Sequence, residues 1–322
     1  MLSDAVVPTE EWRRLTRTLL EILAVTVAYY VAGRIGLLLR VVVEGAVVTP
    51  LWPPTGIAVA ALLWLGLRVW PGIALGAYFS IAHLSGVHTP DIGIIAGNTL
   101  APVCAYLLLR RAGFRTELDR LRDGAALVFL GGLLPMLLSA TIGTLVLVGN
   151  GDLAPSRFWP VWSAWWAGDA MGVLVVTPLL LVLPRVRMPK DPYRVAEAVA
   201  LTVAAGVVAL VTTRSSLSLL FLVFPLLIWS AVRFRLAGSA PVVLLLSVLT
   251  IVAATERVGP FSGHTLFEIM VNLQALNGSA ALTALLLSAL VTEQHNIRLK
   301  IEQVCEDLAE VVERLAPRRP GD

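Results

Sequence analysis

Long apolar runs recur almost from end to end of this 322-residue chain. The chain is 57% hydrophobic and 15% charged, with a mean hydropathy of +0.81. A soluble domain of this length needs more charge to cover its surface, whereas about 20 apolar residues in a helix span the hydrocarbon core of a bilayer. The strict alternation of a transmembrane barrel strand is absent, so helices must satisfy the backbone in lipid. The sequence therefore predicts an all-α, polytopic integral membrane helix bundle.

The apolar runs divide into about ten candidate membrane segments, within a range of eight to ten. We predict them at 15–38, 54–67, 70–86, 92–110, 124–148, 159–183, 195–213, 217–232, 237–254 and 265–292.

Arginine and lysine cluster in loops around 110–122, 185–194 and 233–235, while the intervening loops 87–91 and 149–158 hold at most Arg157. By the positive-inside rule, these basic loops and both termini lie in the cytoplasm of a bacterial inner membrane. Clusters of this kind set orientation, so the net charge of +3 does not indicate nucleic-acid binding. We interpret residues 1–14 as an N-terminal cytoplasmic segment that is not a cleavable signal.

Two Trp-Pro pairs, Trp52-Pro53 and Trp70-Pro71, bracket the second segment. Proline in a first helical turn costs no hydrogen bond, because those N–H groups have no partner within the helix. A helix between the pairs spans about 24 Å, less than the ~30 Å of the hydrocarbon core. Residues 52–86 therefore form either full spans in a thinned bilayer or partial helices buried in the bundle.

The helix start at Trp52, Pro53, Pro54, Thr55 and Gly56 has two interpretations. Thr55 can cap the helix, Gly56 allows a close backbone approach, and tryptophan suits the membrane interface, so the motif can be an interfacial anchor. If the same turn is buried, its N–H groups can bind a polar or anionic ligand.

Three segments carry a polar residue beside a small one: Asn98, Asp169 and Asn277. Asp169 lies about ten residues, or ~15 Å, into its segment. A carboxylate at that depth costs about 3 kcal/mol unless it is paired, protonated or hydrated, so it is the leading ligand-binding candidate. The alternative is a structural hydrogen bond between helices. Asn98 and Asn277 are cheaper to bury and serve either role.

Trp162 and Trp166 share a helical face with Asp169 and can form the wall of a pocket over it, although a tryptophan belt at the interface also explains them.

His83, His88 and His264 are weak metal candidates, because they do not share one element with ligand spacing. We expect no metal, no cofactor and no enzymatic activity, since the chain lacks a phosphate loop, a nucleophile elbow and an HExxH motif.

Residues 293–316 change to an amphipathic pattern in which apolar residues alternate at spacings of four and three. These residues are Ile297, Ile301, Val304, Leu308, Val311 and Leu315. The pattern predicts a cytoplasmic coiled-coil-like helix that continues the last membrane helix and forms the seam of a homo-oligomer of undetermined size. The alternative is an amphipathic helix that lies on the membrane. We expect a disordered tail at 317–322, after a membrane-embedded domain at 15–292.

Four stretches in this order, 51–78, 96–111, 165–181 and 224–238, resemble the membrane-associated sensor (MASE) domain of the first type. The likeness spans about 15–295. The resemblance implies an integral membrane input module of bacterial signalling proteins, which usually precedes a histidine kinase, a diguanylate cyclase, a phosphodiesterase or PAS domains. Asp169, Asn98 and the Pro53–Gly56 turn stand at the recurrent motif positions of the family.

The resemblance favours a sensory domain that binds an unknown small ligand or membrane cue and relays it through the last membrane helix. No output domain follows the heptad tail, so we expect a partner in trans, such as a histidine kinase of a two-component system or a diguanylate cyclase of cyclic-di-GMP signalling, or else a truncated chain. The first alternative is a small-molecule transporter or transport subunit, because short, interrupted helices and a midplane carboxylate are also transporter features. A scaffold that only oligomerises through its tail is the second.

Overall fold

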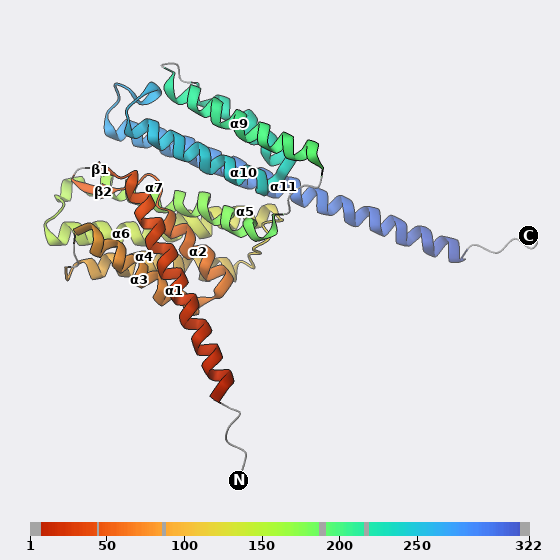
Figure 1. The fold of residues 1–322 in the computed structure, drawn as a ribbon, viewed down its shortest axis with the longest axis horizontal. Helices are drawn as coiled ribbons and strands as arrows, with labels where there is room; N and C mark the ends of the chain where they lie inside the picture. The colour runs from red at the N-terminus through yellow and green to blue at the C-terminus, as the bar shows by residue number, and fades with distance from the viewer. Residues whose placement is uncertain (1–7, 44, 86–87, 187–190, 216–218, 316–322) are drawn as a thin grey trace, which may run out of the picture.

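The computed structural model describes residues 8–315, except residues 44, 86–87, 187–190 and 216–218. It is a helix bundle, as the composition predicts, from which the final helix projects on one side (Figure 1). Within the described residues, seven helical stretches are long and apolar enough to cross a membrane. The stretches are Trp12–Leu38, Asp91–Arg111, Leu121–Asn150, Pro155–Arg185, Pro192–Arg214, Leu220–Thr255 and Leu266–Val312.

The first half of the chain forms the part of the bundle around α1. Its elements are α1 (Pro8–Leu38), β1 (Val41–Val43), β2 (Ala46–Val48), α2 (Pro53–Leu65), η1 (Leu67–Val69), α3 (Trp70–Ser85), α4 (Asp91–Arg111), α5 (Leu121–Ala126), η2 (Leu127–Leu133) and α6 (Leu134–Asn150). The second half contains η3 (Pro155–Arg157), α7 (Phe158–Met171), η4 (Gly172–Val176), α8 (Thr177–Val182), η5 (Leu183–Arg185), α9 (Pro192–Arg214), η6 (Leu220–Leu222), α10 (Val223–Thr255), η7 (Gly259–Phe261) and α11 (Leu266–Leu315).

The predicted all-α class is confirmed, and beside the helices β1 and β2 form one short antiparallel hairpin with Val41 opposite Val48. The hairpin is too short to show the long alternation that sequence reasoning looks for in a barrel strand. It packs beside α7 at one end of the bundle (Figure 1). The chain that leaves it, from Thr49 to Trp52, leads directly into α2.

Helices α2 and α3 are both short. At 13 residues, α2 spans about 20 Å and does not cross a ~30 Å hydrocarbon core. It ends at Gly66, whose φ of 81° is a conformation that glycine adopts without a Cβ penalty. Residues 54–62 of α2 include no exposed position, and all of them except Ile57 are buried. Of the two alternatives for 52–86, partial helices buried in the bundle therefore describe α2.

The central helix is the stretch Pro155–Arg185, in which 67% of the most apolar window is buried. It contains a π-helical turn, η4, and the neighbouring stretch Leu121–Asn150 contains another, η2. In each case a proline follows two residues after the π turn, Pro178 after η4 and Pro135 after η2. A proline removes one hydrogen bond of the α-helical ladder and crowds the preceding turn, which gives both distortions a local cause.

The stretch Val223–Thr255, labelled α10, contains two helices. Arg235 has φ 55° and ψ −147°, which no helical residue adopts. A Cβ atom at Gly238 would lie 3.4 Å from the carbonyl oxygen of Ser230, although eight residues of straight helix cover about 12 Å. The chain therefore folds back sharply at Arg235, between the segments predicted at 217–232 and 237–254.

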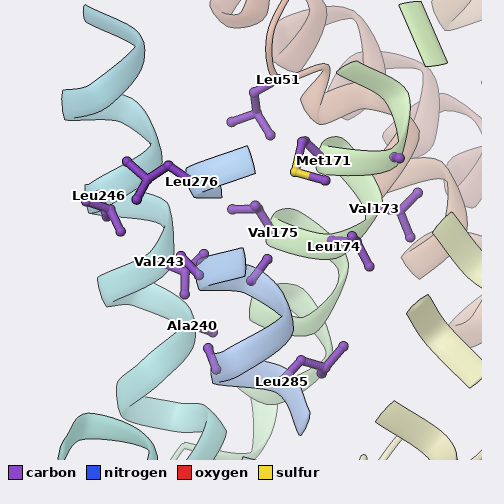
Figure 2. Packing of buried hydrophobic residues seen from close by; sticks show 14 of the residues in the cluster. Leu51, Met171, Val173, Leu174, Val175, Ala240, Val243, Leu246, Leu276 and Leu285 are labelled. Carbon is purple, nitrogen blue, oxygen red and sulfur yellow. The ribbon is translucent and has the colours of Figure 1, made fainter. Parts of the chain in front are cut away.

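The predicted continuation of the last membrane helix into the heptad tail is confirmed, because α11 runs for 50 residues without interruption. Its first part packs against α10 and the central helix. Figure 2 shows α11 between α10 and the central helix, with Leu276 on the side of Leu246 and Leu285 on the opposite side.

The basic loops gather at one end of the bundle. Arg185 forms an ion pair with Glu117, and Glu293 of α11 accepts a hydrogen bond of 2.9 Å from the backbone nitrogen of Leu121. Arg233 forms an ion pair with Glu197. The placement of this end in the cytoplasm stays a prediction from the charge pattern, as does the exact number of crossings.

Candidate functional site

The Asp169 carboxylate lies in the interior of the bundle, with only 1% of the residue exposed. The hydroxyl of Thr55, in the first turn of α2, donates a hydrogen bond of 2.6 Å to Oδ1. The hydroxyl of Ser139, in α6, donates to Oδ2 at 2.5 Å. Hydroxyl donors on the two oxygens therefore connect α7 to α2 and α6 through this one carboxylate. Within the described residues, no arginine, lysine or histidine forms an ion pair with it.

The first turn of α2 is buried against Asp169, since Pro54, Thr55 and Gly56 are all buried. Of the two interpretations of this motif, the buried turn is therefore the one that the structure has. Thr55 does not cap α2, because its hydroxyl binds Asp169 and the helix begins without a side-chain cap. Pro53 and Pro54 have no N–H group, and the N–H of Thr55 donates to the carbonyl of Trp52 at 3.3 Å. The turn thus presents a hydroxyl to the carboxylate, and among the described hydrogen bonds none runs from a backbone N–H of this turn to Asp169.

Glycines allow this turn to sit directly on the central helix. A Cβ atom at Gly172 would lie 2.0 Å from the carbonyl oxygen of Trp52, and one at Gly56 would lie 2.1 Å from the carbonyl oxygen of Gly172. One turn earlier, a Cβ at Gly168 would lie 2.2 Å from the carbonyl oxygen of Thr49. Real Cβ atoms do not approach so closely, so these positions require glycine. The close backbone approach predicted for Gly56 is confirmed.

A backbone hydrogen bond fixes the same contact. The nitrogen of Trp52 donates to the carbonyl oxygen of Gly168 at 3.0 Å, and the hydroxyl of Thr177 donates to the carbonyl oxygen of Gly56 at 2.9 Å. On the opposite side of the turn, Gly36 of α1 packs against Trp52 and Pro53. The turn is therefore held between α1 and the central helix.

Sequence reasoning missed two parts of this site, although each left a signal. Gly168 and Gly172 are four residues apart and flank Asp169, a GxxxG pattern typical of close packing in membranes. Ser139 is a small polar residue in an apolar run, a position that often marks a hydrogen bond between membrane helices. Only the fold could show that Ser139 reaches Asp169.

Trp162 and Trp166 lie on the α6 side of α7, in stacked geometry with ring centroids 6.1 Å apart. Trp162 donates its indole hydrogen to the hydroxyl of Thr141 at 3.0 Å, and Trp166 donates to the carbonyl oxygen of Leu133 at 2.8 Å. The shared face with Asp169 is confirmed, since all three side chains bind groups in the η2–α6 stretch. The pocket wall stays a prediction.

Asn98 is half-buried in α4, beside Gly97, where a Cβ atom would lie 3.5 Å from Cα of Ser139. It thus lies one residue from the contact with the Asp169 partner. Asn277 is on α11 and only 1% exposed, and both polar atoms of its amide lack a hydrogen-bond partner within the described residues. Its neighbour Gly278 faces Met171, two residues after Asp169. Asn277 is therefore close to the central helix and does not belong to the Asp169 hydrogen-bond group.

A second polar residue of α11, which the sequence did not single out, reaches the same region. Gln274 donates a hydrogen bond of 2.9 Å to the carbonyl oxygen of Pro50, and its own carbonyl oxygen is buried without a partner. The segment from Pro50 to Thr55 therefore contacts α11 at its beginning and Asp169 at its end.

The three histidines lie apart, each with its own neighbour: His83 by the ring of Tyr30, His88 by Asp91 and His264 by Glu268. Within the described residues, no group of three His, Cys, Asp or Glu side chains is close enough to hold a metal ion.

The seam residues of the tail, from Ile297 to Val311, are all at least 48% exposed. The side chain of Leu315 and residues 316–322 lie outside the described part of the chain, as do residues 1–7 of the predicted N-terminal segment. An apolar seam open along one helix face is available to a partner, and the oligomer stays a prediction.

The fold is a multi-pass helical bundle with a buried carboxylate group and a projecting final helix. This is the architecture of an integral membrane protein. A family model for MASE1 matches residues 22–295, so the chain belongs to the MASE1 family. MASE1 is a membrane sensory domain typically found with diguanylate cyclase or kinase domains, and the protein is accordingly a multi-pass protein of the inner membrane.

The chain is also similar to the probable diguanylate cyclase DgcE of Escherichia coli (strain K12), with 30% identity over 206 residues. The match covers 59% of this chain and 17% of that protein, so the chain spans a small part of the length of its relative. No solved structure matches.

Proposed function

We propose that the group formed by Asp169, Thr55 and Ser139 is the input site of this sensory domain, and that α11 carries the response to a cytoplasmic output module or partner. A ligand with hydroxyl or amine donors, or a change in the protonation or hydration of the carboxylate, competes with Thr55 for Asp169. The observation that supports the proposal is the buried carboxylate, which holds the start of a short helix by a side-chain hydrogen bond. Intramembrane carboxylates of this kind are functional more often than structural.

The route from the site to α11 is short. Thr55 binds Asp169, and five residues earlier the carbonyl of Pro50 accepts from Gln274 of α11. If Thr55 leaves Asp169, the segment 50–55 can shift, and α11 loses or changes a polar contact that helps to set its register. Asn277, next to Gln274 on the same helix, has a buried amide without partners, which leaves α11 a second set of hydrogen bonds to gain on moving.

The exposed tail then transmits the movement. Since α11 is continuous to Leu315, a shift in the membrane part displaces the tail as one rigid element. The tail seam can dimerise with a second copy or pair with a helix of a cyclase or kinase. We infer that the output is supplied in this way and that this domain itself does not catalyse a reaction. Family membership favours this reading over the transporter alternative.

Cys305 allows a direct test, because it is an exposed cysteine on the tail, whereas Cys104 is half-buried. A spin label on Cys305, in a Cys104→Ala background and in nanodiscs, reports the mobility of the tail. Across a panel of small polar metabolites and a series of pH values, we expect at least one condition to change the spectrum of the parent and not that of Asp169→Asn. Asp152→Asn, in an exposed loop, is the matched control and should respond as the parent does.

If folded Asp169→Asn retains every spectral change, the Asp169 site is wrong. The relay needs a coupling measurement, since proximity alone does not show coupling. A double-mutant cycle of Thr55→Val and Gln274→Leu, read at the same label, should give a non-additive effect, and strictly additive effects would contradict this route. Uptake of the responding metabolite into proteoliposomes separates the transporter, because a sensor binds without net flux.

A further inference from the structure

The first turns of α1 carry a concentration of arginines where the helix extends beyond the rest of the bundle (Figure 1). A hollow of about 450 Å³ there is lined by Arg13, Arg14, Arg17 and Arg68. Arg68 comes from η1, so the hollow lies between two separate elements of the fold. It involves none of the residues around Asp169.

One carboxylate fixes two of these arginines. Glu21 forms ion pairs with Arg17 at 3.0 Å and with Arg68 at 2.9 Å. Within the described residues, neither Arg13 nor Arg14 forms an ion pair. Glu21 therefore engages two of the four guanidinium groups, and since each guanidinium has five N–H donors, the described contacts occupy only a few of the donors at this site. A site of this composition favours an anion with several oxygen acceptors, and arginine binds phosphate in a bidentate manner.

The hollow continues along α1 into an apolar surface. A second hollow of about 600 Å³, which shares Arg13 and Arg17 with the first, is also lined by Trp12, Thr16, Leu20, Glu21 and Ala24. On the same helix, Leu19 and Leu23 are more than half exposed, as a lipid-facing surface requires. Trp12 is 67% exposed at the level of the arginines, where an amphipathic ring suits the headgroup region. Cationic donors thus stand directly above an apolar stripe.

From this arrangement we propose that the arginines of α1 and η1 hold the phosphate headgroup of an anionic phospholipid, with its acyl chains along Leu20 and Ala24. A free phosphate ion has no use for the apolar floor, whereas a phospholipid has both parts in this order. The charge pattern places this end in the cytoplasm, and basic pockets between membrane segments on that side are suited to anionic headgroups. The bound lipid would brace α1 against η1 beside Glu21.

The test uses the full chain purified in mild detergent and native mass spectrometry of the lipids that it retains. Phosphatidylglycerol is offered in competition with phosphatidylcholine. We expect the parent to retain phosphatidylglycerol preferentially, and the Arg13→Gln/Arg14→Gln variant to lose the preference by roughly fivefold for each arginine removed. Arg13→Lys/Arg14→Lys keeps the charge and should restore most of the retention. Both positions are exposed, so these variants should fold as the parent does.

Arg298→Gln/Lys300→Gln is the matched control, because it removes the same charge from the exposed tail of α11. It should retain phosphatidylglycerol as the parent does. An equal loss in this control would show general attraction to a basic protein and overturn the site. Displacement of phosphatidylglycerol by glycerol phosphate, which has no acyl chain, would indicate a free-phosphate site and overturn the lipid assignment. Unchanged retention in Arg13→Gln/Arg14→Gln would also overturn it.

Discussion

Two buried polar residues of this bundle, Asp169 in α7 and Asn277 in α11, are both 1% exposed and yet differ in every contact. Asp169 has a hydroxyl donor on each carboxylate oxygen, and glycines on both sides admit the backbone of the Thr49–Gly56 segment. Asn277 has no hydrogen-bond partner within the described residues. Asp169 is thus closely packed with both carboxylate oxygens hydrogen-bonded, whereas the amide of Asn277 has hydrogen-bonding groups without partners.

Under the proposed mechanism, this difference gives the two residues different parts in signalling. The Asp169 carboxylate keeps its two hydroxyl donors until a ligand or a proton competes for it, which is the behaviour expected of an input site. An unpaired amide in the interior destabilises the arrangement it occupies, so it favours a change of helix position in which it gains a partner. Since α11 also continues into the exposed tail, it is the element whose position has an external consequence.

The largest effect should come from filling the glycine contact. Gly172→Ala places a Cβ atom 2.0 Å from the carbonyl oxygen of Trp52, and neither backbone can move without the other. We expect a loss of about 3 kcal/mol or more in the free energy of unfolding in detergent. Gly278→Ala in α11 is the control, because its nearest neighbour would be the mobile end of Met171 at 3.8 Å. It should be neutral within roughly 0.5 kcal/mol. If Gly172→Ala and Gly278→Ala lower the free energy of unfolding equally, the close contact between Gly172 and Trp52 is not the cause of the loss.

Leucine substitutions should affect the two polar positions in opposite directions. Asp169→Leu leaves the Thr55 hydroxyl without an acceptor, whereas Asp169→Asn keeps an acceptor oxygen. We therefore expect Asp169→Leu to be about 2 kcal/mol less stable than Asp169→Asn, a comparison between two uncharged side chains. Asn277→Leu removes an unpaired amide and should stabilise the fold by about 1 kcal/mol. Chemical unfolding of the purified variants measures both. Destabilisation by Asn277→Leu would contradict the contrast between the two sites.

The two hydroxyls on Asp169 should be unequal. Thr55→Val keeps the shape of the side chain and removes the donor to Oδ1, so we expect a loss of about 1 kcal/mol. Ser139 also lies 3.2 Å from the carbonyl oxygen of Met136, an alternative acceptor in its own helix. When Asp169 is replaced by leucine, a further Ser139→Ala change should therefore cost more than a further Thr55→Val change, because Thr55→Val then removes a hydroxyl that has no acceptor. Unfolding of the two double variants decides the order.

The smallest effect on the bundle should come from the tail. Leu308→Asp places a charge in an exposed apolar seam that makes no contact with the membrane part. The free energy of unfolding of the bundle should stay within about 0.5 kcal/mol of the parent, while the mass of the oligomer in detergent falls. Lys300→Asp, outside the seam, should leave the mass unchanged. If Leu308→Asp leaves the mass unchanged too, the tail does not hold copies together through this seam.

The sequence alone determined the membrane class, the main apolar segments, the burial of a carboxylate at Asp169 and the heptad tail. Each of these depends on a regular local pattern: the length of an apolar run, the depth of a charge within it, or a spacing of three and four. The need for glycine at Gly56 was also readable, since a small residue in a helix start is what a close backbone approach demands.

Only the tertiary structure decided which groups meet. Ser139 and Thr55 lie 30 and 114 positions from Asp169 in the chain, and no local pattern connects them. The hairpin at Val41–Val48, the contact of Gln274 with Pro50 and the unpaired amide of Asn277 likewise depend on how the helices pack. A lipid-facing sequence specifies where a chain enters the membrane through its transfer free energy. The hydrogen-bond partners of its few interior polar atoms come from distant segments that the fold brings together.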